Sequence, residues 1–114
     1  MSRLATHWTI QSASTTLRVH NVTIRRLILS GEIKGEYRGG RWIIPVEEMR
    51  NFIGDSSTRF YTPVEIEQLL LCSKETIKGE IAKGALRSVK VGKLIRVSQL
   101  ALDDYMSYLS TSQQ

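Results

Sequence analysis

The sequence is poor in the side chains that bind metals or form disulfides. Its 114 residues contain one cysteine, Cys72, and two histidines, His7 and His20. One cysteine cannot form an intrachain disulfide, and these three side chains are too few for a thiolate zinc cluster. We therefore expect no disulfide and no metal, with Cys72 as an inert packing residue.

Catalytic motifs are lacking as well. The sequence contains no recognisable pairing of a nucleophile with a base, no glycine-rich phosphate loop and no set of metal ligands. We expect a protein that is not an enzyme and needs no cofactor.

Long apolar runs are absent. No segment approaches the roughly 20 apolar residues that a membrane-spanning helix requires, and residues 1–5 do not begin a signal peptide. We expect a cytoplasmic protein without a membrane partner.

Positive charge is what the chain has in excess. Sixteen lysines and arginines stand against eleven acidic residues, which gives a formal net charge of +5. This balance favours an anionic partner, although a surplus of surface lysines that only improves solubility would look the same.

The chain aligns with itself at a shift of 53 residues without a gap. Identical pairs fall on cap, core and glycine positions, where physical constraints limit the choice of residue. They are Thr9 and Thr62, Leu17 and Leu70, Thr23 and Thr76, Ile24 and Ile77, Ile28 and Ile81, Gly31 and Gly84, and Gly39 and Gly92. We infer a repeat.

Each copy predicts two short helices joined by a turn, then a hairpin and a closing helix. In the second copy Thr62, Pro63 and Glu65 form a capping-box signature, Ser73 can cap the next helix and Gly84 can end it. The expected helices span 10–17, 21–30, 46–53, 63–70, 74–83 and 99–109, and the expected strands span 33–37, 42–44, 86–90 and 94–97.

These elements predict a mainly helical α+β fold with two modules, at residues 6–53 and 61–109, and a linker at residues 54–60. A copy of about fifty residues can bury only a modest core. We therefore expect the copies to support one another as an internal pseudo-dimer within a monomeric chain.

The second copy, through the segments 61–66, 72–77, 91–93 and 96–98, resembles the winged helix-turn-helix domains of the excisionase and MerR-like group of DNA-binding proteins. The first copy follows the same pattern less closely. Two tandem copies are similar to the small accessory DNA-binding proteins of conjugative transfer systems. The resemblance implies double-stranded DNA as the partner, with the second helix of each module in the major groove and the hairpin wing on the backbone or minor groove. It also implies a role on a mobile element, in transfer, excision or transcription control, with other proteins of such a complex as further partners.

Polar and basic side chains near the start of each second helix are the candidates for DNA contact. Arginine can bind guanine through two hydrogen bonds and asparagine can do the same with adenine, whereas lysines suit phosphates. The candidates are Asn21, Thr23, Arg25 and Arg26 in the first copy, Ser73, Lys74, Thr76 and Lys78 in the second, and Arg38, Arg41, Lys90 and Lys93 on the wings. For Thr23 and Thr76, support of the first helical turn is an equal alternative.

The two copies differ in charge. Residues 1–53 contain eight basic and four acidic groups, net +4, whereas residues 61–114 contain seven and six, net +1. We expect the first copy to supply more of the non-specific DNA affinity. The weak charge of the second copy leaves a winged-helix protein adaptor as the alternative function.

The aromatic residues Trp8, Trp42, Phe52 and Tyr105 fall where the helices would pack against the hairpin, so we expect them in the core.

Overall fold

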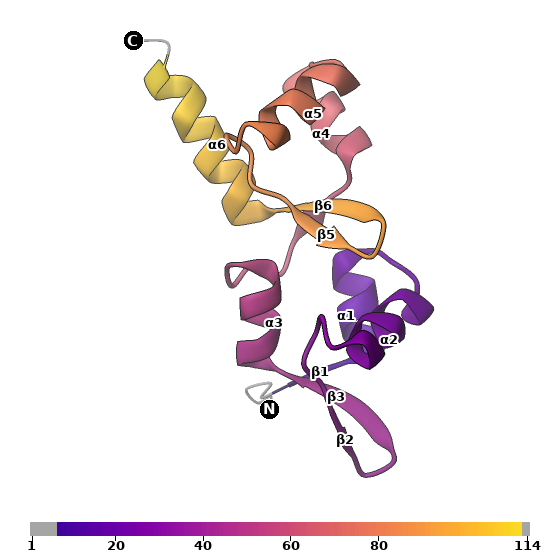
Figure 1. The fold of residues 1–114 in the computed structure, drawn as a ribbon. Coiled ribbons are helices and arrows are strands. Elements are labelled where there is room, and N and C mark those ends of the chain that lie inside the picture. Colours follow the sequence, from indigo (N-terminus) through magenta and orange to yellow (C-terminus); the bar gives the residue numbers. More distant parts are fainter. Residues whose placement is uncertain (1–6, 113–114) are drawn as a thin grey trace. The chain divides into compact units, whose positions relative to one another are not determined.

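The computed structural model describes residues 7–112, which fall into two compact units, Met1–Ser56 and Ser57–Gln114 (Figure 1). Thr6, the expected first residue of the first module, lies outside the described residues. Between residues 7 and 112 the fold is α+β, with six helices and two three-stranded antiparallel sheets.

In the first unit one strand precedes the helix pair along the chain, and a two-stranded hairpin and a helix follow it. Its elements are β1 (His7–Thr9), α1 (Ile10–Leu17), α2 (Asn21–Ser30), β2 (Glu36–Arg38), β3 (Arg41–Pro45) and α3 (Val46–Ile53). The strand order is β1-β3-β2, so the N-terminal strand β1 pairs with β3, the second strand of the hairpin.

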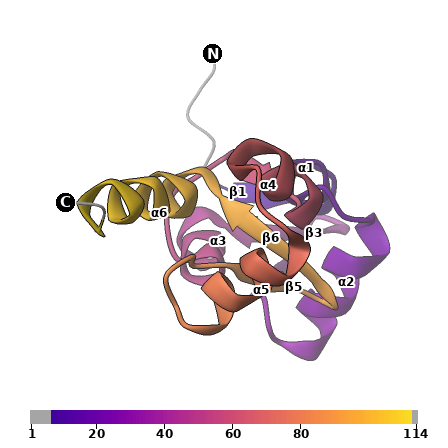
Figure 2. The same cartoon turned by 90° about the horizontal axis from the view of Figure 1, so that it is seen from above.

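The second unit repeats this plan. Its elements are β4 (Phe60–Tyr61), α4 (Pro63–Leu70), α5 (Lys74–Ala82), β5 (Val89–Val91), β6 (Leu94–Ser98) and α6 (Gln99–Ser112). The strand order is β4-β6-β5, and Figure 2 shows α6 continuing directly from the end of β6.

The strand registers of the two units agree residue for residue. His7 pairs with Pro45, and Phe60 pairs with Ser98 at the positions that the shift of 53 residues predicts. The same shift relates every other pair of the second sheet to a pair of the first. The repeat inferred from the sequence is therefore a repeat of backbone structure.

Local signals explain where the helices begin. A complete capping box starts α4, in which the Thr62 hydroxyl accepts from the Glu65 amide at 3.2 Å and the Glu65 carboxylate accepts from the Thr62 amide at 2.9 Å. Thr9 caps α1 in the same way, with Ser12 in the place of the glutamate.

The turn between the two helices is left-handed in both units, at Arg18 (φ 61°) and Leu71 (φ 54°). Left-handed backbone is unfavourable for residues with a Cβ, and it recurs here at equivalent positions of the two units, where it ends α1 and α4. Gly31, with φ 87°, then ends α2.

Each unit buries an apolar face of its second helix against its own hairpin and closing helix. In the first unit Ile24, Ile44 and Met49 are fully buried. In the second, one cluster brings together residues of α4, α5, β6 and α6 and one residue of the loop between α5 and β5: Ile66, Ile77, Leu86, Val97, Ala101, Leu102 and Tyr105. Tyr105 is thus a core residue, as expected.

The structure departs from the sequence prediction at several boundaries. The short strands β1 and β4 were not expected, β2 and β5 begin three residues later than predicted, and α6 continues three residues beyond Leu109. The C-terminal part of the expected linker belongs to the second unit, because Phe60 is buried in β4 and the Ser57 hydroxyl accepts from the Leu100 amide at 3.1 Å.

Among residues 7–112, no helix combines the length and the apolar character needed to cross a membrane. Within the same range, no three His, Cys, Asp or Glu side chains are grouped so that they could hold a metal ion.

Candidate nucleic-acid interface

The second helix of each unit exposes basic side chains. On α2, Arg25 and Arg26 are exposed, and the helix contains no acidic residue. On α5, Lys74 and Lys78 are exposed and lie one turn apart, but Glu75 stands between them in the first turn. The face of α2 is therefore the more strongly positive of the two.

These cations are not neutralised within the part of the chain that the structure describes. No carboxylate among the described residues forms an ion pair with the α2 side chains Arg25 and Arg26. The same is true of the α5 side chains Lys74 and Lys78. Charges without internal partners are available to an anion without first breaking an ion pair.

Asn21 differs from the arginines that follow it. Its Oδ1 accepts from the Ser14 hydroxyl at 2.5 Å, and its Nδ2 donates to Gln11 Oε1 at 3.3 Å. Both ends of the amide thus tie α2 to α1, and binding adenine through both would require these bonds to rearrange. At the equivalent position the second unit has Lys74, for which no such bond is formed within the described residues.

The small hydroxyl residues support the helix starts. Ser73 caps α5 by accepting from the Thr76 amide at 3.2 Å, and the Ser73 and Thr76 hydroxyls lie 3.0 Å apart. Thr23 is half-buried, and its amide donates to the carbonyl of His20 at 3.0 Å. His20 precedes α2 without making a side-chain cap bond. The alternative role, support of the first turn by the threonine side chain, thus has a structural basis for Thr76, whereas the Thr23 bond is one of the main chain.

The wing of the first unit concentrates like charges. Arg38 and Arg41 are directly opposite each other across the Gly39-Gly40 turn, and both are exposed. Like charges at such a pair destabilise a hairpin. Arg38 is compensated by an ion pair with Glu36, whereas Arg41 has no carboxylate partner among the described residues.

The wing of the second unit places its charges differently. Lys90 lies on β5 opposite Ile95, and Lys93 lies in the turn after Gly92. Both lysines are exposed. By the shift of 53 residues Lys90 corresponds to Tyr37 rather than to an arginine, so the basic positions of the two wings are not equivalent.

A polar contact positions α5 against α6. The Tyr105 hydroxyl donates to Glu80 Oε1 at 2.9 Å, and Lys83 pairs with Glu80 Oε2 at 2.9 Å. These two hydrogen bonds, first that of Lys83, lower the pKa of Glu80. Burial, and then the Glu80 carboxylate, raise the pKa of Tyr105 to about 12. Glu80 therefore stays ionised and Tyr105 stays neutral at physiological pH.

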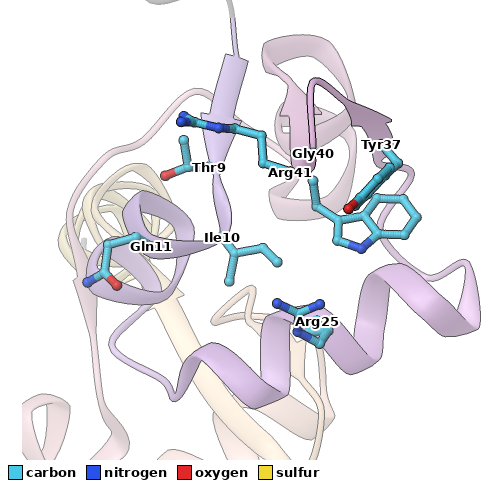
Figure 3. A pocket seen from close by; sticks show the side chains of 8 residues that line it. Thr9, Ile10, Gln11, Arg25, Tyr37, Gly40 and Arg41 are labelled. Atoms are coloured by element: carbon cyan, nitrogen blue, oxygen red, sulfur yellow. The ribbon is translucent and has the colours of Figure 1, made fainter.

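A hollow of about 340 Å³ opens in the first unit between the helix pair and the wing. Figure 3 shows Arg25 on α2 facing Ile10 and the hairpin that carries Tyr37 and Arg41. The hollow is lined by Thr9, Ile10, Gln11, Arg25, Tyr37, Gly40, Arg41 and Trp42. The structure thus brings two of the predicted DNA-contact residues, Arg25 and Arg41, to one site.

Sequence reasoning missed the aromatic side of this hollow. Trp42 was expected in the core, but it is only half-buried and meets the exposed Tyr37 in an edge-to-face contact, with ring centroids 5.3 Å apart. The signal lay in the hairpin register, because an Arg38–Arg41 pair beside the turn places Tyr37 directly opposite Trp42.

No family model matches the chain, and comparisons with curated proteins and with solved structures found no match either. A functional assignment therefore depends on the residues and geometry described above.

Proposed function

We propose that the protein is a non-enzymatic, double-stranded DNA-binding accessory or regulatory protein of the winged helix-turn-helix type. In each unit the second helix would enter the major groove, and the hairpin would lie along the backbone or the minor groove. The main support is that both second helices expose cations that no carboxylate among the described residues neutralises. The resemblance of the second copy to excisionase and MerR-like domains suggests a cytoplasmic role in transfer, excision or transcription of a mobile element.

The proposal assigns different roles to the candidate residues. Arg25 and Arg26 are suited to base edges and phosphates of the major groove, because guanidinium groups can make two parallel hydrogen bonds. Lys74 and Lys78 are suited to phosphates, as are Lys90, Lys93 and Arg41 on the wings. Asn21 instead holds α2 in place through α1.

We further propose that the two units act as an internal pair on successive major grooves, about 34 Å apart on one face of the duplex. The matching strand registers support this, because they give both units the same pairing of the hairpin with the strand that precedes the helices. A footprint covering two segments about one helical turn apart is the expected result, and a single short footprint would contradict the pairing.

A gel-shift titration on random-sequence duplex at rising salt tests DNA binding. Each phosphate neutralised contributes about 0.9 to the slope of log K against log salt, so changing Arg25 and Arg26 to Ala should reduce the slope by about 1 to 2. Arg50→Ala is the matched control, because Arg50 is an exposed cation of the same unit on α3, outside the proposed interface. No shift of the unaltered protein even at low salt would refute the proposal.

A protein adaptor is the second candidate function, and one feature of the second unit favours it. Val64, Leu69 and Leu71 on and after α4 are exposed, Leu71 to 91%. Exposed apolar side chains on a helix and its turn suit a protein partner. This function predicts that the chain does not bind duplex DNA, and that changing Leu69 and Leu71 to Ser abolishes partner binding.

A further inference from the structure

The hollow of the first unit combines positive charge with exposed aromatic rings, and binding to duplex DNA requires only the positive charge. Arg25 and Arg41 supply positive charge from two different elements, and Tyr37 and Trp42 supply aromatic surface. The two arginines are free of carboxylate partners among the described residues.

The aromatic pair is unusually accessible. The Tyr37 side chain is 65% exposed although its ring contacts Trp42 at an interplanar angle of 70°. Tyr105 offers a contrast, because it is 3% exposed and its hydroxyl is bonded to Glu80. Tyr37 therefore contributes little to the core, and its ring is available to a ligand.

Aromatic rings beside cations are the recurring features of sites for single-stranded nucleic acid, where bases stack on the rings and cations hold the phosphates. Intact duplex offers phosphates and base edges, but its base faces are covered by neighbouring bases. The arginines of the hollow could contact either form of DNA. The aromatic rings, in contrast, can stack only on a base that is not covered by its neighbours in a duplex.

The size of the hollow limits what it can hold. Its volume of about 340 Å³ lies at the lower end of the range for small-ligand sites, about 300–1,000 Å³. This is room for one nucleotide and not for a stacked run of bases.

The second unit lacks this site. At the positions equivalent to Tyr37, Arg41 and Trp42 it has Lys90, Leu94 and Ile95. The base-stacking surface and one of the two cations are therefore missing, although the backbone register is the same.

We propose that the hollow of the first unit binds one unpaired nucleotide of single-stranded or locally opened DNA, with its phosphate at Arg25 and its base on Tyr37 and Trp42. This activity goes beyond duplex binding, and it distinguishes the first unit from the second.

Tryptophan fluorescence tests the proposal on the full chain. The sequence has two tryptophans, so Trp8→Phe leaves Trp42 as the only reporter. Single-stranded oligothymidylate of about eight nucleotides, within the usual site sizes, should quench Trp42 and bind measurably. Random-sequence duplex of similar length serves as the comparison.

Tyr37→Ala is the decisive variant, because it removes one of the two rings on which the base would stack and leaves both arginines in place. It should weaken oligothymidylate binding about fivefold or more, the range expected for loss of one stacking partner, and weaken duplex binding less. The matched control is Tyr108→Ala, which removes an exposed tyrosine of α6 that also contacts a ring. Should Trp8→Phe fail to fold, the anisotropy of labelled oligothymidylate compares the two tyrosine variants directly.

The outcomes separate this inference from the proposed function. Duplex binding without oligothymidylate binding, or equal effects of Tyr37→Ala and Tyr108→Ala, would overturn the nucleotide site alone. Oligothymidylate binding with the expected loss in Tyr37→Ala, but no duplex binding, would support the nucleotide site and refute the proposed function.

Discussion

The two units share one backbone plan but fix their second helix by different interactions. In the second unit Glu80 of α5 accepts a hydrogen bond from Tyr105 of α6. The equivalent residues of the first unit are Leu27, which is buried, and Phe52, which is half-buried. A polar contact between α5 and α6 thus stands where the first unit has two apolar residues.

The two units also differ in the charge of their second helices, although they share the same strand pairing. α2 carries cations without an acidic residue, whereas α5 carries Glu75 and Glu80 beside its lysines. The unit whose sequence follows the helix-turn-helix pattern more closely is therefore the less basic one, and a clear fold pattern does not identify the more positive helix.

The largest expected effect comes from Glu80→Ala. This change leaves the Tyr105 hydroxyl without its acceptor, so the free energy of unfolding should fall. Urea unfolding monitored by circular dichroism measures it. The control is Glu80→Leu with Tyr105→Phe, which installs the residues of the first unit and should restore most of the loss. Equal stability of the alanine variant and the unaltered protein would show that the polar contact contributes nothing.

The same contact predicts a loss of stability at high pH. The folded state raises the pKa of Tyr105 to about 12 from an ordinary value of 10.0. The unfolded chain therefore loses this proton first, so the stabilisation is complete below about pH 10 and disappears as the pH rises toward 12. Urea midpoints across this range should fall more steeply for the unaltered protein than for Tyr105→Phe. Parallel curves would contradict the assignment.

A smaller effect, of opposite sign, is expected at Gly79. This glycine lies inside α5, and an added Cβ would meet no atom within 4 Å. Gly79→Ala should therefore stabilise the protein by about 1 kcal/mol, raising the melting temperature by several degrees. Gly31→Ala is the matched control and should destabilise, because Gly31 has a φ of 87°. A lower melting temperature for Gly79→Ala would indicate an unrecognised constraint on α5.

The helices could be predicted from sequence because their signals are local. The capping box at Thr62 and Glu65 and the left-handed glycine at Gly31 each act within a few residues, and α1, α2, α3 and α4 have the predicted bounds. The strands β1 and β4 could not be predicted in this way. They have three and two residues, and each is defined by pairing with a strand more than thirty residues away.

The candidate site was predictable in its charges but not in its contacts. Arg25 was identified from its place near the start of the second helix and Arg41 from its place beside the hairpin turn, and both line the hollow. Asn21 has the right side chain for adenine, yet a serine seven residues earlier binds it. Trp42 was predicted to lie in the core, because the sequence does not show which face of a hairpin the helices cover; the structure leaves it half-buried beside Tyr37.

The salt dependence of duplex binding by two double variants tests the central claim most directly. One variant changes Arg25 and Arg26 to Ala, and the other changes Lys74 and Lys78 to Ala. Removing a cation that neutralises one phosphate lowers the slope of log K against log salt by about 0.9, and α2 is the more basic helix. We predict that the arginine variant flattens the slope more than the lysine variant. Equal flattening, or the reverse order, would contradict the account.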